Sequence, residues 1–224
     1  MIRCEGAAFT YPDGTRALDD IDLSIEAGER VALVGRNGSG KSTLIRLWNG
    51  LLRPTAGKVI IDGRPTDGRR VAELARTVGM TFQDPDRQLF SSNCRQEVAF
   101  GARNVGLREG DLDTATDAAL AAVGLADRAG ANPYDLGGSQ RRLLALACVL
   151  AMRTPIVVLD EPTMGLDSGE VARVAGIVAS LAAAGRTVVA ISHDARFVAG
   201  AFERFVRLDA GRVVTEAAPR EVLE

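Results

Sequence analysis

Gly35 to Ser42 read GRNGSGKS, which matches the pattern G-x-x-x-x-G-K-[ST] of a phosphate-binding loop. In such a loop the glycines let backbone N–H groups surround the phosphates, Lys41 reaches the β- and γ-phosphates, and the Ser42 hydroxyl binds Mg²⁺. The segment follows an apolar run and precedes a segment with helical spacing, as the motif requires. It therefore predicts a site for a nucleoside triphosphate. The residues predicted to bind the nucleotide there are Gly35, Arg36, Asn37, Gly38, Ser39, Gly40, Lys41, Ser42 and Thr43.

Two carboxylates end the apolar run IVVLDE at residues 156–161. Asp160 is expected at the C-terminal end of a buried strand, beside the phosphates, where it holds the metal ion through water. Glu161 is placed to polarise an attacking water. The alternative interpretation, a solvated acidic pair at the end of a strand, loses weight because a phosphate loop is present.

Two more polar residues follow apolar runs that predict parallel strands. His193, the single histidine of the chain, comes directly after TVVAIS, and Gln83 ends TVGMTFQ. Ligands of parallel sheets bind beyond the carboxyl ends of the strands, where these residues converge with Gly35 and Asp160. We expect His193 to sense the γ-phosphate and Gln83 to reach the metal ion or the attacking water. The alternatives are a structural histidine and a solvated glutamine.

Tyr11 lies in an early turn and is one of only two tyrosines. Its ring is suited to stack on an adenine base, as aromatic side chains do in nucleic-acid binders. Partial burial on a small layer of strands accounts for Tyr11 almost equally well, and both interpretations stay open.

A second possible phosphate cradle lies about a hundred residues downstream. Gly137, Gly138, Ser139 and Gln140 precede LLALACVLAM, a run typical of a buried helix. Small residues at a helix N-terminus leave free N–H groups, which bind anions. Ser139 is expected to cap the helix or to offer its hydroxyl. The residues alone do not say whose phosphate this cradle serves.

The elements that position these residues are predicted from hydrophobic periodicity. Short strands and turns are expected over residues 1–30, strands end at 35, 83, 161 and 192, and residues 87–152 are mainly helical. Residues 204–214 predict a hairpin around Asp209–Gly211. Strands that alternate with helices indicate an α/β fold with a mostly parallel sheet and right-handed crossovers.

Composition narrows the classes of protein. The 224 residues are 46% apolar and carry a net charge of -2, which fits one large domain or a core with a subdomain and argues against a nucleic-acid binder. Three scattered cysteines without metal-ligand spacing favour a reducing cytosol. The N-terminus lacks the apolar segment of a signal peptide. The longest apolar run, residues 143–152, is about half the ~20 residues of a membrane span. Any membrane role is therefore expected to come through a partner.

In their order along the chain, these motifs resemble the ATP-binding cassette (ABC) ATPases. The resemblance implies one ABC ATPase domain over residues 1–224, with an antiparallel β-layer near 1–30 and 55–63, a helical subdomain near 87–152 and a RecA-like core. It implies that the substrate is ATP with Mg²⁺. By position, Glu161 is the general base, His193 the γ-phosphate switch and Gln83 the link between metal and partner. Asp167 in GLDS belongs to a loop that communicates across a dimer.

The same resemblance offers an occupant for the second cradle. In this family two chains close head to tail, and the signature of one chain caps the γ-phosphate bound to the other. The usual signature L-S-G-G-Q is here LGGSQ, so Gly137 lacks the hydroxyl that contacts the phosphate. A hydrogen bond to a charged group is worth ~1.5–3 kcal/mol, enough to slow the partner's site about tenfold without abolishing binding. In a heterodimer the two sites are then expected to be unequal.

A narrower resemblance is carried by FTYPDGTRALDD, NGLLRPTAG, FQDPDRQLF and EVAFGARN. These segments are similar to the ATPases of energy-coupling factor (ECF) importers of metal ions or vitamins. The resemblance implies a peripheral subunit on the inner face of the cell membrane, with a transmembrane T component near Gln83, a solute-binding S component and no nucleic acid. Because little chain follows the last hairpin, weaker dimerisation without ATP is expected.

Two other functions remain open beside this one. The first is the ATPase of an ordinary ABC transporter, against which FQDPDRQLF argues. The second is a regulatory module that binds nucleotide and hydrolyses it only marginally; the rearranged signature supports it, and Glu161 and His193 oppose it. DNA-repair and translation-factor relatives need a coiled-coil insertion or a second cassette, which the sequence lacks, and a small-molecule kinase leaves LGGSQ and His193 unexplained.

Overall fold

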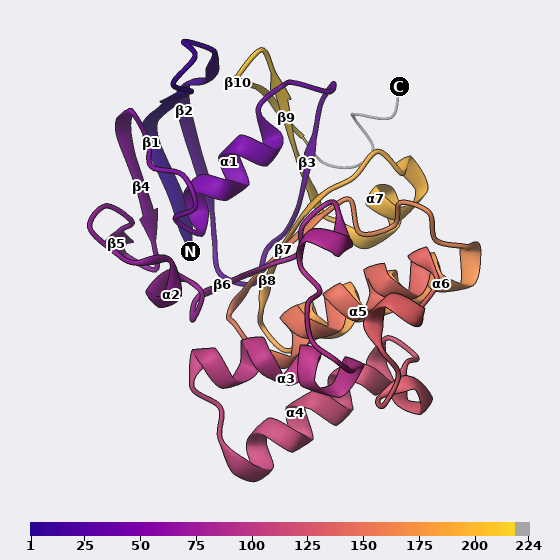
Figure 1. Ribbon diagram of the computed structural model, residues 1–224. Helices are drawn as coiled ribbons and strands as arrows, with labels where there is room; N and C mark the ends of the chain where they lie inside the picture. Colours follow the sequence, from indigo (N-terminus) through magenta and orange to yellow (C-terminus); the bar gives the residue numbers. More distant parts are fainter. Residues whose placement is uncertain (218–224) are drawn as a thin grey trace.

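The computed structural model describes residues 1–217, and their strands form two sheets (Figure 1). The antiparallel sheet and helix α1 lie at the upper left of Figure 1, and the strands of the larger sheet cross the centre. The helices α3 and α4 lie at the bottom, below α5. The α/β class expected from the sequence is confirmed. The last residues of the predicted domain, 218–224, lie outside the described part of the chain.

The antiparallel sheet has the strand order β2-β1-β4-β5 among the described residues. Its inner face is apolar because residues alternate along β2: Ile21, Leu23 and Ile25 are buried, while Asp22 between them is exposed. These side chains pack on α1, whose Trp48 is fully buried. The strands are β1 (Ile2–Thr10), β2 (Arg16–Ile25), β4 (Ala56–Ile61) and β5 (Arg64–Pro65).

The core sheet has the order β10-β9-β3-β8-β7-β6 and is parallel except for β10, which pairs antiparallel with β9. All five residues of β7 and of β8 are buried, as expected for strands covered on both faces. The hairpin predicted around residues 209–211 is the β9–β10 turn. The strands are β3 (Arg30–Val34), β6 (Val78–Met80), β7 (Ile156–Asp160), β8 (Thr187–Ile191), β9 (Arg204–Asp209) and β10 (Arg212–Ala217).

Helices cover the core sheet, and α3, α4 and α5 form one apolar cluster beneath it. Residues Leu143 to Val149 of α5 are buried without interruption, because this helix lies between its neighbours and the sheet. The helices are α1 (Lys41–Trp48), α2 (Val71–Leu74), α3 (Cys94–Val105), α4 (Glu109–Ala122), α5 (Gly138–Ala151), α6 (Ser168–Ala183) and α7 (Ala195–Ala201). Single 3₁₀ turns span Pro85–Arg87, Ala126–Arg128 and Pro133–Asp135. No helix within residues 1–217 is long and apolar enough to cross a membrane.

The strand expected to reach residue 83 is shorter than predicted. It ends at Met80, although the Thr81 N–H still donates to Val158 O at 3.0 Å. Asp84 then accepts the N–H of Asp86 at 3.1 Å and begins a 3₁₀ turn at Pro85, whose ring cannot continue a ladder. Gln83 therefore lies in a loop beyond the strand.

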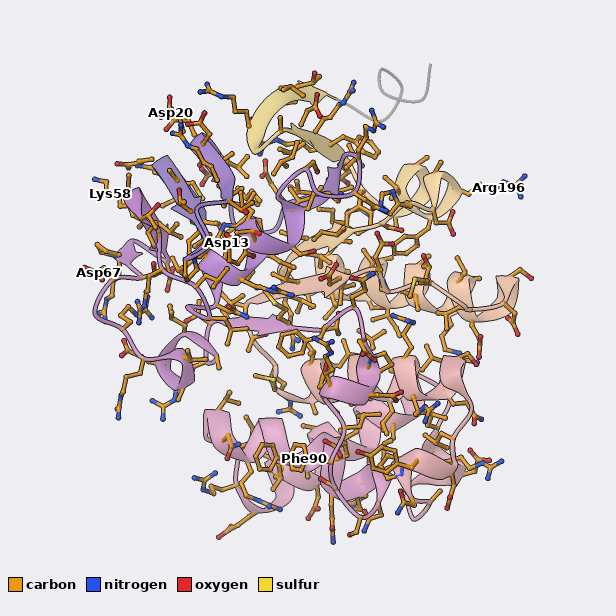
Figure 2. All side chains as sticks on the ribbon, turned by 45° about the horizontal axis from the view of Figure 1, so that its top comes forward. Asp13, Asp20, Lys58, Asp67, Phe90 and Arg196 are labelled. Carbon is orange, nitrogen blue, oxygen red and sulfur yellow. The ribbon has the colours of Figure 1, made fainter. Side chains whose placement is uncertain are left out.

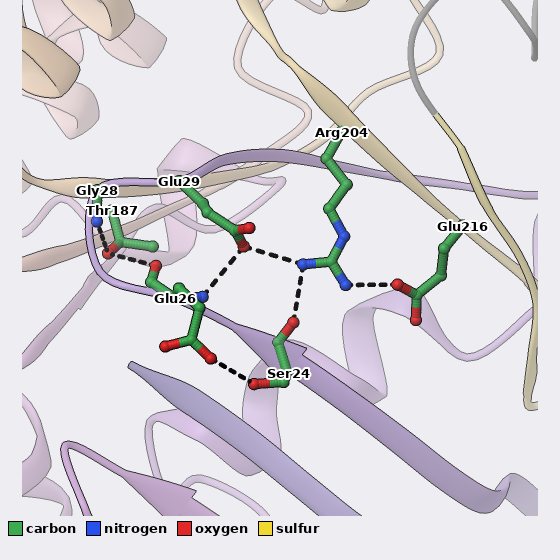
Figure 3. Close-up of polar contacts among 7 residues, drawn as sticks. All are labelled: Ser24, Glu26, Gly28, Glu29, Thr187, Arg204 and Glu216. Atoms are coloured by element: carbon green, nitrogen blue, oxygen red, sulfur yellow. Dashed lines mark hydrogen bonds and ion pairs between the residues drawn. The ribbon is translucent and has the colours of Figure 1, made fainter.

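One arginine joins the two sheets at the end remote from the phosphate loop (Figure 3). Arg204 on β9 donates from Nη1 to Ser24 O at 2.8 Å and to Glu29 Oε2 at 2.9 Å, and its Nη2 pairs with Glu216 on β10. Thr187 adds a second link, since its hydroxyl accepts the N–H of Gly28 at 3.0 Å. The start of β3 is thereby held between both layers.

Candidate active site

The phosphate loop forms one wall of a cavity of about 860 Å³ at the carboxyl edge of the core sheet. Most of the residues predicted to act on nucleotide line it together. From the phosphate loop and its helix these are Asn37, Gly38, Ser39, Gly40, Lys41, Ser42 and Thr43; from other elements they are Tyr11, Gln83, Asp160, Glu161 and His193. Gly35 and Arg36, which were also predicted to bind nucleotide, do not line the cavity.

The path of the phosphate loop depends on close contacts with distant segments. Gly35 has φ +144°, and a Cβ there would lie 2.2 Å from Leu208 O. Gly40 has φ +103°, and its Cβ would lie 2.6 Å from Ala17 O. A side chain is excluded at both positions by space and by backbone conformation. The Gly211 N–H also donates to Ser39 O at 3.1 Å, so the last hairpin supports the loop.

The Lys41 side chain turns back onto the phosphate loop. Its Nζ donates to Gly35 O at 2.7 Å and to Arg36 O at 3.0 Å, and the residue is buried. Burial lowers the pKa of the ammonium group, and the charges of Glu161 and Asp160 oppose this shift. The positive charge therefore sits at the floor of the cavity, facing two carboxylates.

Asp160 and Glu161 lie at the end of β7 and are both buried. Burial raises the pKa of Asp160 to about 6, and the neighbouring charge of Glu161 adds to the increase. The charges of Arg46 and Lys41 act in the opposite direction. Two adjacent buried carboxylates repel each other, which makes the pair a favourable place for a cation. Glu161 also has φ +51°, a backbone conformation that is uncommon for residues other than glycine.

His193 contacts the second of these carboxylates. Its Nε2 lies 3.4 Å from Glu161 Oε1, and its backbone N–H donates to Glu161 Oε2 at 3.3 Å. The imidazole is about half exposed, with 55% of its side-chain surface accessible at the mouth of the cavity. Its ring can therefore meet a ligand while one edge remains on Glu161.

Tyr11 is partly buried and lines the same cavity. Its ring packs edge-on against Phe9, with ring centroids 4.8 Å apart, and its hydroxyl lies 3.1 Å from Thr43 Oγ1. Both interpretations of this residue thus find support: one edge is packed on the β-layer, and the ring lines the cavity.

The second cradle, Gly137 to Gln140, does not line this cavity. Gly137 and Gly138 are exposed at the start of α5, and Leu136 before them is buried as an anchor. The expectation that Ser139 caps the helix is wrong. The N-cap is Gly137, and Gln140 Oε1 accepts its N–H at 3.2 Å, so Ser139 lies one turn position too late to cap.

Asp167 also lies outside the cavity. It caps α6 by accepting the N–H of Glu170 at 2.8 Å, while Glu170 Oε2 accepts the N–H of Asp167 at 3.0 Å. This reciprocal capping box fixes the loop between Glu161 and α6.

Some lining residues were not predicted from the sequence. Thr163 and Met164 follow Glu161, and Asp194 follows His193, so their closeness to predicted residues was an available signal. Arg16 and Ala17, beyond the Tyr11 turn, carried no motif. Arg142 was missed as well, although its Nη1 donates to Gln83 O at 2.9 Å and to Glu161 O at 3.2 Å.

A family model described as "ABC transporter" matches residues 18–164. The chain belongs to this family. It is 41% identical to the energy-coupling factor transporter ATP-binding protein EcfA of Methanothermobacter thermautotrophicus over 99% of this chain and 72% of that protein. It is 38% identical to EcfA of Methanocaldococcus jannaschii over 99% of this chain and 80% of that protein.

Solved ABC structures agree with the fold. CbiO1 of Clostridium perfringens, described as part of the ABC transporter complex CbiONQ, superposes with a TM-score of 0.87 at 35% identity over 99% of this chain and 89% of its own. A dimeric ATP-binding cassette in a post-hydrolysis state with ADP and Pi gives a TM-score of 0.90 at 29% identity over 98% and 99%. Both resemblances expected from the sequence, to ABC ATPases and to the ECF group, are confirmed. As an ABC ATPase, the chain binds ATP and couples its hydrolysis to transport.

Proposed function

We propose that the chain is the ATP-hydrolysing subunit of an ECF-type importer of a metal ion or vitamin, and that ATP drives it to close as a dimer. One observation carries the proposal. The phosphate loop, Asp160, Glu161 and His193 line a single cavity, while the signature Gly137–Gln140 lies outside it on the same chain, with Gly137 and Gly138 exposed. Each cavity therefore needs the signature of a second chain to complete it.

The residues of the cavity fit the steps of ATP hydrolysis. Backbone N–H groups of the phosphate loop and the Lys41 ammonium bind the phosphates. Glu161 orients the attacking water in line with the γ-phosphate and accepts its proton, and His193 holds the γ-phosphate and the Glu161 side chain in register. Tyr11 stacks on the adenine.

The oxygen atoms around the phosphates fit Mg²⁺. Ser42, Gln83 and Asp160 all line the cavity and supply hydroxyl, amide and carboxylate oxygens, which this ion prefers. A bound cation also offsets the burial and the neighbouring Glu161 charge, which together raise the Asp160 pKa. When bound, Mg²⁺ neutralises charge that develops on the transferred phosphoryl group.

Two ATPase chains, the same or homologous, are proposed to form a head-to-tail dimer. In it, the free N–H groups at the start of α5 face the partner's γ-phosphate, and the Asp167 loop lies at the dimer contact. The dimeric cassette with ADP and Pi supports this arrangement. Because Gly137 lacks a hydroxyl, the site that it caps is the weaker one in a heterodimer.

The membrane partners are proposed to be a T component, which receives the motion, and an S component, which binds the solute. Phe90 and Phe100 offer the T component an apolar contact: their rings are 4.8 Å apart and 58% and 44% exposed. Phe90 lies on the helical side of the molecule (Figure 2), a few residues beyond Gln83. This docking places the subunit peripherally on the inner face of the cell membrane.

The regulatory module with marginal hydrolysis is not favoured, because the relatives and the solved neighbour are transporter ATPases. One experiment tests the role of Glu161 and the closure of the dimer. Light scattering of the Glu161→Gln variant is expected to show an ATP-dependent dimer, and its turnover should fall about 10²- to 10⁴-fold with ATP binding retained. Turnover within threefold of wild type contradicts the role of Glu161. A monomer that binds ATP shows that LGGSQ cannot close as a homodimer, and the partner is then sought among second ATPase chains.

A further inference from the structure

The loop after β6, residues 82–91, is fastened to the helical part of the molecule rather than to the sheet. Contacts with α3, α5 and the 3₁₀ turn before α5 hold it at several points. These contacts are Gln88 Nε2 to Ala145 O at 3.2 Å, Tyr134 Oη to Leu89 O at 2.9 Å, Phe90 N to Glu97 Oε2 at 2.8 Å, and Arg141 Nε to Asp86 Oδ1 at 3.4 Å. A movement of α5 therefore carries this loop with it.

Arg142, in the first turns of α5, adds a contact that reaches the core as well. One nitrogen, Nη1, donates to Gln83 O at 2.9 Å and to Glu161 O at 3.2 Å. Because Nη1 carries two hydrogens, both bonds can form at once. The guanidinium group thus bridges the signature helix α5, the loop that carries Gln83, and Glu161, the residue directly after β7.

The surroundings of Arg142 strengthen these bonds. Burial lowers the pKa of its guanidinium group, while the charges of Asp84, Glu161 and Asp160 raise it. The group stays charged at any ordinary pH, and a charged donor in a partly buried place makes stronger hydrogen bonds than a neutral one.

The Arg142 side chain contacts the carbonyl of Glu161, a residue whose backbone conformation is strained. Glu161 has φ +51°, and its N–H donates to Ile191 O at 2.9 Å. Such a conformation persists only when surrounding contacts fix it. Ile191 O holds the peptide group on one side of Glu161, and Arg142 holds the carbonyl on the other.

We propose that Arg142 is a positioning residue that ties the orientation of the signature helix to the backbone of Glu161. It touches neither the nucleotide nor the water; it acts through Glu161 and the Gln83 loop. When α5 shifts to cap the partner's nucleotide, the guanidinium group moves the Glu161 carbonyl in the same chain. Each chain thereby couples the partner's ATP site, which its signature helix caps, to its own ATP site. The effect on rate rests on the proposed function, whereas the tie itself does not.

Hydrogen exchange tests the tie without activity, on the full chain. The Arg142→Met variant keeps the length of the stem but removes the donors, and Arg142→Lys restores one donor. In Arg142→Met, the amides of 83–88 and of 161–166 are expected to exchange at least fivefold faster, and Arg142→Lys should recover part of this protection. The matched control Arg141→Ala, which breaks only the contact to Asp86, should affect 83–88 alone. Wild-type exchange at 161–166 in Arg142→Met overturns the proposal.

The rate of ATP hydrolysis then tests whether this link affects catalysis. In Arg142→Met, kcat is expected to fall at least fivefold while the Kd for ATP stays within twofold, and the lysine variant should lie between. If the wild-type protein does not hydrolyse ATP, the proposed function fails. The hydrogen-exchange result then still decides whether Arg142 links α5 to the backbone of Glu161. If wild type turns over and Arg142→Met keeps its kcat, the positioning role alone is wrong. Should Arg142→Met unfold, Arg142→Gln replaces it under the same criteria.

Discussion

His193 holds the Glu161 carboxylate at both oxygens: its Nε2 lies 3.4 Å from Oε1, and its N–H donates to Oε2 at 3.3 Å. The backbone contact survives any substitution of the side chain except proline, whereas the ring contact depends on the imidazole. The two contacts can therefore be separated by mutation. They fix the direction of the carboxylate before a nucleotide arrives.

Replacing the imidazole should slow hydrolysis without loss of nucleotide. In His193→Ala, Glu161 keeps the backbone contact but loses the ring, so kcat is expected to fall about tenfold or more while the Kd for ATP changes less than threefold. Arg196→Ala is the control, because Arg196 projects from the surface of the nearby α7 (Figure 2). Equal turnover in the two variants removes His193 from the mechanism.

Removing the Asp160 charge should stabilise the nucleotide-free protein. The pKa of this carboxyl is about 6 in the folded chain against 3.8 for an unperturbed aspartate, so the folded form binds more protons and stability falls as pH rises from about 4 to 6. At pH 7.5 the charge costs roughly 2–3 kcal/mol. Asp160→Asn should then raise Tm by about 4–8 °C at pH 7.5 and by much less at pH 4.5. Asp127→Asn, at an exposed position, serves as the control for charge alone. The same gain at both pH values contradicts the assignment.

Replacing Gly137 of the signature by serine should restore a hydroxyl and speed the closure of the dimer. Gly137 has an extended backbone, and a Cβ there finds only Gln140 Oε1 at 3.9 Å, so serine fits without strain. Gly137→Ser supplies a side-chain cap and a donor for the partner's phosphate, worth ~1.5–3 kcal/mol toward a charged group. Turnover per dimer is expected to rise about tenfold, with a Tm change of a few degrees at most. The control is Gly110→Ser on α4, where a Cβ meets no atom within 4 Å. No gain over this control means that LGGSQ already caps fully.

The glycines of the phosphate loop should differ sharply in tolerance. A methyl group at Gly35 meets Leu208 O at 2.2 Å, whereas one at Gly38 meets nothing within 4 Å, although both positions have positive φ. Gly35→Ala is therefore expected to destabilise the fold by several kcal/mol, and Gly38→Ala by about 1–2 kcal/mol. Urea unfolding measures both. Similar midpoints for the two variants show that the hairpin moves aside.

The sequence alone predicts those parts of the fold and the site that depend on short motifs and on runs of apolar residues. The phosphate loop needs glycines and a lysine at fixed spacing, and β7 needs a buried apolar run, so Lys41 and Asp160 could be placed from the chain alone. The end of β6 at Met80 depends on the Asp84 cap and Pro85, which periodicity does not weigh. Ser139 does not cap because the N-cap is Gly137, two residues before the position that the sequence suggested. Arg142 carries no motif; its role arises from two carbonyls, Gln83 O and Glu161 O, which the fold brings together although they lie 78 residues apart in the sequence.

The support of the phosphate loop by Leu208 and Gly211 bears on how the protein is made. A ribosome delivers the phosphate loop well before the β9–β10 hairpin, and β9 must then pair with β3, which was synthesised long before it. A nascent chain that stops before residue 204 lacks both the neighbouring strand and the backbone that shapes Gly35 and Ser39. Such a chain carries the whole nucleotide motif but lacks the backbone that packs against the phosphate loop in the finished fold.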